Sequence, residues 1–135
     1  MAHPVRYKSG EKRIVGIIGD EDTVTGFLLA GIGDNRVAMA HKNHRTRESD
    51  LMPNYLVVGP STPLSDIESA FTSMCSRGDI GIIIITQNIA NDIRHLIQQH
   101  TAVIPSILEI PSKDQKYDPE KDFILEKINR ALGIR

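Results

Sequence analysis

Three consecutive acids, Asp20, Glu21 and Asp22, are the residues of this chain whose types and spacing best suit chemistry. They directly follow an apolar run that is typical of a strand, and carboxylates at the end of a strand are suitable ligands for a hard cation such as Mg²⁺. The same acids precede a helical pattern, where an acid caps the first turn and interacts favourably with the helix dipole. The sequence therefore leaves two interpretations open: a cation site, or caps for the next helix.

Histidines and a cysteine form a second set of candidates. His41 and His44 lie in a basic segment, residues 34–54, but no cysteine accompanies them there, as a structural metal site of mixed Cys and His ligands would require. We predict that this segment is a long solvated loop, with a phosphate-binding patch as the alternative. Cys75, the single cysteine, lies on the apolar face of a helical pattern. We therefore expect it in the core and not as a nucleophile.

Familiar catalytic and nucleotide-binding arrangements do not occur in the sequence. The turn after the first apolar run reads Gly-Asp-Glu-Asp, whose carboxylates would repel a dinucleotide pyrophosphate. The chain has no Walker lysine motif and no recognisable Ser/His/Asp arrangement. A phospho-receiver domain needs a phosphate-accepting aspartate at the end of its central strand, where this chain has Thr86. We predict a protein without catalytic residues, cofactor or metal, with the three acids as the open alternative.

The charge and cysteine content exclude several classes of partner. The 135 residues carry 16 basic and 17 acidic side chains, whereas nonspecific binding to nucleic acid or to an anionic membrane leaves a basic excess. A single cysteine suits a reducing compartment, and no stretch resembles a signal peptide or a transmembrane helix. We expect a cytosolic protein of one domain that binds no nucleic acid and does not insert into a membrane.

An apolar strand at the centre of the chain must position the candidate groups. Residues 79–86 read Asp-Ile-Gly-Ile-Ile-Ile-Ile-Thr. A run without a polar face is typical of a strand covered on both sides, as in a parallel sheet between helices. The other three strands are predicted at Ile14–Gly19, at Tyr55–Val58, which we place at an edge, and at Ala102–Ile110. Because Pro105 interrupts the last of these runs, we expect that strand to lie at an edge or to begin at Ser106.

Helical patterns alternate with these strands. The first helix is predicted to have Asp22 or Thr23 as its cap, with Gly31 and Gly33 placed to end it. The second is predicted to be capped by Ser65. It places five residues on one face: Ile67, Ala70, Phe71, Met74 and Cys75. In the third, the inward residues are Ile89, Ile93, Leu96 and Ile97, and the outward ones are Arg94, His95 and Gln98.

This alternation predicts an α/β fold. The fold class is a four-stranded parallel sheet flanked by helices, similar to half of a receiver or flavodoxin fold, plus a tethered C-terminal helix. We expect residues 1–13 to form a flexible arm, 14–111 the α/β head, 112–117 a polar linker and 118–135 the C-terminal helix. In such sheets, ligands bind at the carboxyl ends of the strands.

The C-terminal helix is predicted to be amphipathic. It opens at Asp118-Pro119 and closes at Gly133, and Glu126 and Arg130 are spaced to pair on its wet side. Its apolar stripe consists of Ile124, Leu125, Ile128 and Leu132. A tethered helix with one such stripe either folds back on the sheet or docks on a partner.

Three stretches of the chain resemble one known family. Residues 20–33, Asp-Glu-Asp-Thr-Val-Thr-Gly-Phe-Leu-Leu-Ala-Gly-Ile-Gly, are similar to the first helix of the F subunit of the eukaryotic V-type proton ATPase. Residues 80–94 contain the matching core Ile-Ile-Ile-Thr-Gln-Asn-Ile-Ala. Residues 105–122 contain Pro-Ser-Ile-Leu-Glu-Ile-Pro-Ser-Lys-Asp and then Tyr-Asp-Pro-Glu-Lys-Asp. Residues 34–54 depart from the family in length and basic charge, so no contact is carried over to them.

The resemblance implies a non-catalytic subunit of the central stalk of a rotary proton pump, the V-ATPase. Such a protein pairs with the coiled-coil D subunit inside the ring of ATP-hydrolysing subunits, and its C-terminal helix packs on the stalk and can affect ATPase activity. The protein would then lie at the cytosolic face of vacuolar or other endomembranes, held there by the assembled pump. The alternative, from the residues alone, is a degenerate receiver-like signalling module that binds a cation at residues 20–22.

Overall fold

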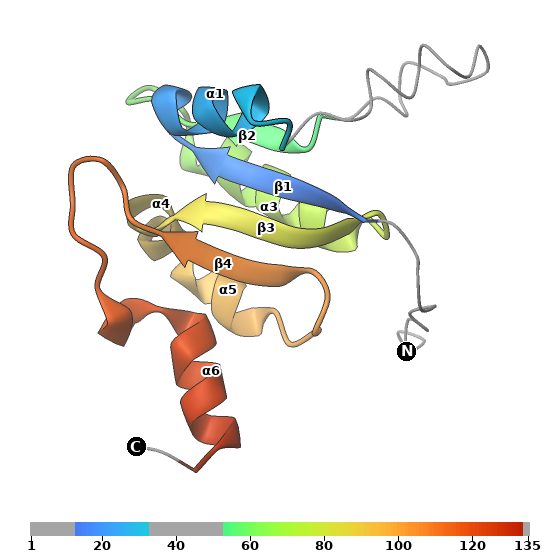
Figure 1. The fold of residues 1–135 in the computed structure, drawn as a ribbon, viewed down its shortest axis with the longest axis vertical. Coiled ribbons are helices and arrows are strands. Elements are labelled where there is room, and N and C mark those ends of the chain that lie inside the picture. The colour runs from blue at the N-terminus through green and yellow to red at the C-terminus, as the bar shows by residue number, and fades with distance from the viewer. Residues whose placement is uncertain (1–12, 33–52, 134–135) are drawn as a thin grey trace.

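The computed structural model describes residues 13–32 and 53–133, which form a four-stranded, all-parallel sheet with helices packed against it (Figure 1). The predicted arm and basic segment lie outside these residues, apart from Arg13, Pro53 and Asn54. The strands follow the spatial order β2 (Tyr55–Val57), β1 (Ile14–Gly19), β3 (Ile80–Thr86) and β4 (Ser106–Ile110). The predicted fold class is confirmed, and the strands predicted at the edges, β2 and β4, lie there.

The isoleucine-rich strands β1 and β3 form the middle of the sheet. Ile18 lies opposite Ile85 in the register, so their side chains share one face, and both are fully buried. Three helices cover that face: α3 (Leu64–Ser76), α4 (Gln87–Asp92) and α5 (Arg94–Gln99). Together with Ile93, which lies between α4 and α5, they supply the other half of the core: Ile67, Phe71, Met74, Ile89, Ala90 and Ile97. Six residues predicted to face inward are therefore confirmed there: Ile67, Phe71, Met74, Ile89, Ile93 and Ile97. Ala90 is an additional buried residue that the pattern did not single out.

The opposite face of the sheet is covered only in part. Helix α1 (Glu21–Leu29) lies against β1 and β2, where Ile17 and Val24 are fully buried (Figure 1). Farther along the sheet, Ile82 of β3 is 41% exposed and Leu108 of β4 is 42% exposed. The expectation that the central strand is covered on both sides is therefore wrong at this end of the face. A helix of nine residues, placed over β1 and β2, does not cover β3 and β4 as well.

Two helix caps differ from those predicted. Asp20 caps α1: its Oδ2 accepts a hydrogen bond from the backbone N–H of Thr23 at 3.2 Å, and its Oδ1 accepts one from the Thr23 hydroxyl at 2.6 Å. The predicted caps, Asp22 and Thr23, lie inside the first turn because the helix starts as soon as β1 ends. Helix α3 follows Pro63 without a side-chain cap, so Ser65 also lies inside its helix.

The third predicted helix is two helices. The backbone of Ile93 adopts φ −114° and ψ 26°, which separates α4 from α5. The break lets α5 run in its own direction, and Arg94, which was predicted to face solvent, instead reaches Glu109 of β4. The prediction that Arg94 faces outward is therefore wrong.

The C-terminal helix begins five residues later than predicted. Asp118 and Pro119 open only a short 3₁₀ turn, η2 (Pro119–Lys121), in which the Asp118 carboxylate accepts from the N–H of Glu120 at 3.1 Å. Asp122 then caps α6 (Phe123–Ala131) by accepting from the N–H of Ile124 at 3.0 Å. Both aspartates are good caps, and the chain uses each of them in turn.

Candidate partner-binding interface

Helix α6 projects from the head beyond the edge strand β4 (Figure 1). Of its predicted stripe, Ile124 and Leu125 are half-buried, whereas Ile128 is 46% exposed and Leu132, the C-cap residue, is 67% exposed. On its polar side, Arg130 donates to Glu126 at 2.7 Å, as the i, i+4 spacing predicted. The structure thus leaves the outer half of the predicted stripe without a covering element in the described part of the chain.

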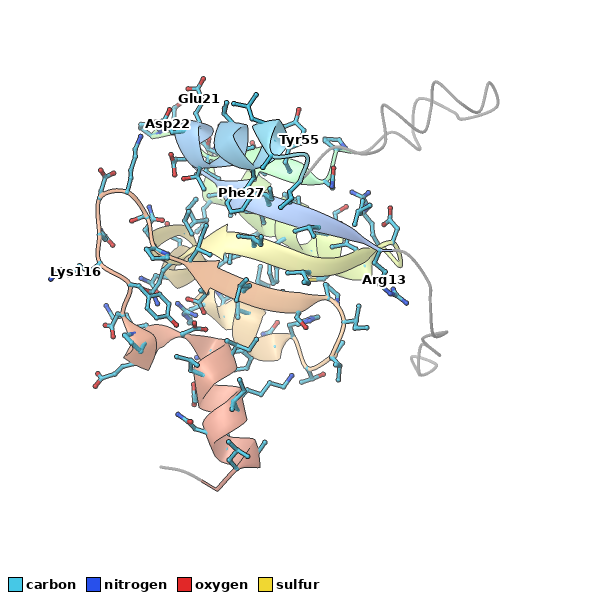
Figure 2. The ribbon with its side chains drawn as sticks, in the orientation of Figure 1. Arg13, Glu21, Asp22, Phe27, Tyr55 and Lys116 are labelled. Atoms are coloured by element: carbon cyan, nitrogen blue, oxygen red, sulfur yellow. The ribbon has the colours of Figure 1, made fainter. Side chains whose placement is uncertain are left out.

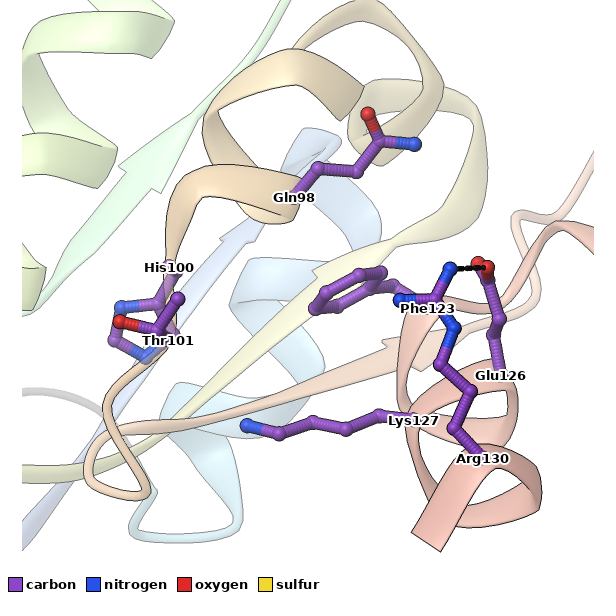
Figure 3. Close-up of a pocket in the computed structure, with 7 residues that line it drawn as sticks. All are labelled: Gln98, His100, Thr101, Phe123, Glu126, Lys127 and Arg130. Atoms are coloured by element: carbon purple, nitrogen blue, oxygen red, sulfur yellow. Dashed lines mark hydrogen bonds and ion pairs between the residues drawn. The ribbon is translucent and has the colours of Figure 1, made fainter. Parts of the chain in front are cut away.

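A groove separates α6 from the end of α5 (Figure 3). It has a volume of about 460 Å³ and an opening toward solvent. Figure 3 shows the ring of Phe123 and the charged side chains of α6 on one side, with His100 and Thr101 on the other. His100 is held to its own loop, because its Nε2 lies 2.7 Å from the carbonyl oxygen of Pro105. The outer part of α6 therefore stands away from the head.

The first residues of α6 are held firmly to the head. Phe123 is half-buried and packs against the main hydrophobic core. Asp122 is buried, and besides capping the helix it accepts a hydrogen bond from the hydroxyl of Tyr117. Burial raises the pKa of Asp122 above its usual range, with the Glu109 carboxylate adding to the shift. Burial and the hydrogen bond to Asp122 raise the pKa of Tyr117 to about 12.

Glu109 is the part of this junction that the sequence analysis missed. Its carboxylate, 5% exposed as a residue, accepts two hydrogen bonds from the Arg94 guanidinium, at 2.7 and 2.9 Å. It also accepts one from the backbone N–H of Phe123 at 3.1 Å. A partial signal was present in the sequence: Glu109 shares a strand face with Ile107, and a charged carboxylate that is buried is usually paired with a cation.

The chain around the predicted polar linker, residues 112–117, contacts the head at two points. The side chain of Gln87 donates to the carbonyl of Asp118 at 2.8 Å and accepts from the N–H of Asp118 at 2.6 Å. Lys113 Nζ lies 2.8 Å from a carboxylate oxygen of Asp22 at the start of α1. Because both ends of residues 113–118 are bound to the head, α6 leaves from a fixed base.

Two of the three acids considered as a cation site, Asp20 and Asp22, have other partners. Lys113 Nζ lies 2.8 Å from Asp22 and 3.7 Å from Asp20. Asp20 is the N-cap of α1, and Glu21 and Asp22 lie in its first turn, where Figure 2 labels them. The hydrogen bond from the Thr23 hydroxyl lowers the pKa of Asp20. Within residues 13–32 and 53–133, no group of three or more His, Cys, Asp or Glu side chains is arranged to hold a metal ion. The capping interpretation accounts for the geometry of Asp20, and the ammonium of Lys113 supplies the opposite charge.

The remaining candidates are Cys75 and the two histidines of the basic segment. Cys75 is half-buried on α3, and burial raises the pKa of its thiol to about 11. His41 and His44 lie outside the described residues. Among the helices that the structure describes, none has the length and apolar content needed to cross a membrane.

Comparison with known proteins places these features in a family context. The family model described as "ATP synthase (F/14-kDa) subunit" matches residues 15–128, which include the head and most of α6. The chain is 48% identical over 123 residues to the V-type proton ATPase F subunit of Dictyostelium discoideum, covering 91% of this chain and 92% of that protein. It is 51% identical over 118 residues to the protein of the same name from Xenopus laevis, covering 87% and 94% respectively. The Homo sapiens protein of that name is 45% identical over 126 residues, which covers 93% of each chain.

Proposed function

Since the chain belongs to the F-subunit family of V-type proton ATPases, we propose that it is a non-catalytic rotor component of the pump's central stalk. In this proposal it pairs with the coiled-coil D subunit and couples or regulates ATP hydrolysis by the catalytic head. It contributes no catalytic group, cofactor or metal of its own. It resides at the cytosolic face of an endomembrane, held there through its protein partners.

The exposed stripe of α6 is the observation that supports this proposal most directly. Ile128 and Leu132 are exposed on a helix that projects from the head, and Glu126 and Arg130 pair on its polar side. An amphipathic helix with apolar residues four apart is suited to a groove between the helices of a coiled coil. Burial of the whole stripe would contribute on the order of 5 kcal/mol before the cost of ordering the two partners.

Cosedimentation with the purified stalk coiled coil tests this interface. Ile128→Asp and Leu132→Asp each place a charge in the stripe. Both residues are exposed, so the head should stay folded. We expect each variant to weaken binding by at least about tenfold, because a carboxylate would have to lose its hydration in an apolar contact. Glu126→Gln, on the polar side of the same helix, is the matched control and should bind as the parent does. Equal binding by the parent and both stripe variants would eliminate the proposed interface.

A further inference from the structure

Glu109 connects helix α5 to the start of helix α6. It lies on the edge strand β4, and its three hydrogen bonds come from Arg94 of α5 and from the backbone of Phe123, the first residue of α6. Its side chain is 1% exposed and that of Arg94 is 20% exposed, so the pair is largely removed from water. A bidentate pair of this kind has a defined geometry, which fixes the carboxylate relative to both helices.

The first turn of α6 shows why this geometry matters. The first backbone N–H groups of a helix have no partner within the helix. Here the N–H of Phe123 is bound by Glu109 and that of Ile124 by Asp122, so two buried carboxylates hold two successive donors. Asp122 is in the same segment as the helix and moves with it, whereas Glu109 belongs to the sheet. Of these two carboxylates, only Glu109 connects the first turn of α6 to the sheet.

The rest of α6 offers little else to set its direction. No residue of the helix is buried, and the groove beside α5 separates its outer turns from the head. Gln87 binds the backbone of Asp118, which lies before η2. This contact fixes where the chain leaves the head, but it does less to fix the direction of α6.

We propose that Glu109, neutralised by Arg94, is a positioning residue that sets the direction in which α6 leaves the head. The inference deepens the proposed function and rests on it for the consequence in the pump: the stripe is presented to the partner at a fixed angle, which reduces the ordering cost of binding. In the free chain the positioning role stands on the geometry alone and is measured there.

Distance measurement between two spin labels tests the positioning role in the full chain. In a Cys75→Ala background, Thr72→Cys on α3 and Asn129→Cys on α6 give two exposed labelling positions. We expect one narrow distance distribution for the parent and a distribution at least about twice as broad for Glu109→Ala. Glu109→Gln should give an intermediate width, because its amide oxygen still accepts from the N–H of Phe123 while the charged pair with Arg94 is lost. Glu126→Gln, which removes an exposed carboxylate of the same helix, should leave the width unchanged.

A folded Glu109→Ala variant with the narrow distribution of the parent would overturn the proposal. Circular dichroism and thermal melting establish whether each variant is folded. If the alanine variant does not fold, the Glu109→Gln variant decides. Its neutral amide oxygen is a weaker acceptor than the carboxylate, so we expect amide hydrogen exchange at Phe123 to be faster than in the parent. Unchanged exchange together with an unchanged width of the distance distribution would overturn the positioning role. If the pair of Glu109 with Arg94 only stabilised the fold, the Glu109 variants would melt at a lower temperature but keep the label distances of the parent.

The binding assay separates failure of this inference from failure of the proposed function. We expect Glu109→Ala to bind the stalk coiled coil several-fold more weakly although its stripe is intact. If Ile128→Asp and Leu132→Asp bind as the parent does, the proposed interface fails whatever the label distances show. If the stripe variants lose binding while Glu109→Ala keeps the narrow distribution, only the positioning role fails.

Discussion

Burial changes the acid–base behaviour of several side chains in this protein, and each case has a local cause. Cys75 lies half-buried against the core, and this environment disfavours its thiolate. Asp122 is buried next to another carboxylate, Glu109, and its charged form is disfavoured although it caps a helix. Because the shifts depend on burial in the folded chain, both groups are good reporters of folding.

Thiol alkylation should report the burial of Cys75. Since its pKa is raised to about 11, against about 8.5 for an exposed cysteine, the thiolate fraction at pH 8 is lower on the order of a hundredfold. We expect a thiol reagent to react with the native protein at least that much more slowly than with the protein in denaturant. Native and denatured rates that agree within a few-fold would show that the thiol is not buried.

Asp122 gives a stability effect whose sign depends on pH. A carboxyl with a raised pKa binds its proton more tightly in the folded state, so it stabilises the fold at low pH and loses that contribution as pH rises through the folded-state pKa. Asp122→Asn removes the charge and keeps a capping oxygen for the N–H of Ile124. We expect the variant to melt a few degrees above the parent at pH 7, with the difference shrinking toward pH 4.

Thermal melting of three proteins across this pH range tests that expectation. Asp114→Asn, which removes an exposed carboxylate of the same C-terminal region, shows the effect of one surface charge alone. An Asp122→Asn variant that is less stable than the parent at pH 7, with the gap closing at low pH, would mean that the charged form is favoured in the fold.

At the scale of single elements, strand β3 has two faces with different roles. Ile83 and Ile85 are fully buried against α3, α4 and α5, whereas Ile82, on the other face of the same strand, is 41% exposed. All these residues are isoleucines, so their chemistry and strand propensity are identical. The difference in burial comes only from where the covering helices lie.

This contrast predicts different costs for the same substitution. Ile83→Ala should lower the free energy of unfolding by about 2–5 kcal/mol, because it removes buried apolar volume and leaves a cavity. Ile82→Ala should cost less than about half as much, since its side chain is partly in water already. Urea unfolding of the two variants measures both values, and equal losses would show that the second face of β3 is also covered in solution.

At the scale of the whole molecule, the head holds the core and α6 is attached to it only at its base. The base consists of Asp122, Phe123 and the contacts with Glu109 and Gln87, whereas residues 126–133 are all exposed. The core and the exposed stripe therefore lie in different parts of the chain. Under the proposed function, the head would carry the stability of the protein and α6 would carry its contact with the partner.

Removal of the outer part of α6 should therefore leave the head stable. A chain that ends at Leu125 retains Asp122 and Phe123, and we expect its free energy of unfolding to change by less than about 1 kcal/mol. A chain that ends at Pro111 loses Phe123 and the contacts with Gln87 as well, and it should be less stable than the first truncation. Urea unfolding compares the two, and a large loss in the chain that ends at Leu125 would show that the outer turns of α6 are needed for the core.

The sequence by itself determined the elements and their alternation. Apolar runs without a polar face predicted β1 and β3, the spacing of Ile67, Phe71 and Met74 predicted the inner face of α3, and the same period predicted the stripe of α6. These features depend on residues close together in the chain, where the backbone geometry relates spacing to direction. The matching segments also identified the family before any contact was known.

The tertiary structure decided what depends on segments far apart in the sequence. Arg94 and Glu109 are 15 residues apart and belong to different elements, so no local period relates them. The choice of Asp122 over Asp118 as the cap of α6 depends on the turn between them and on the contact of Gln87 with that turn. The exposure of Ile82 depends on the placement of α1 over β1 and β2. In each case the outcome depends on which segments come together in the folded chain. The spacing of residues along the sequence does not determine this when the segments are far apart.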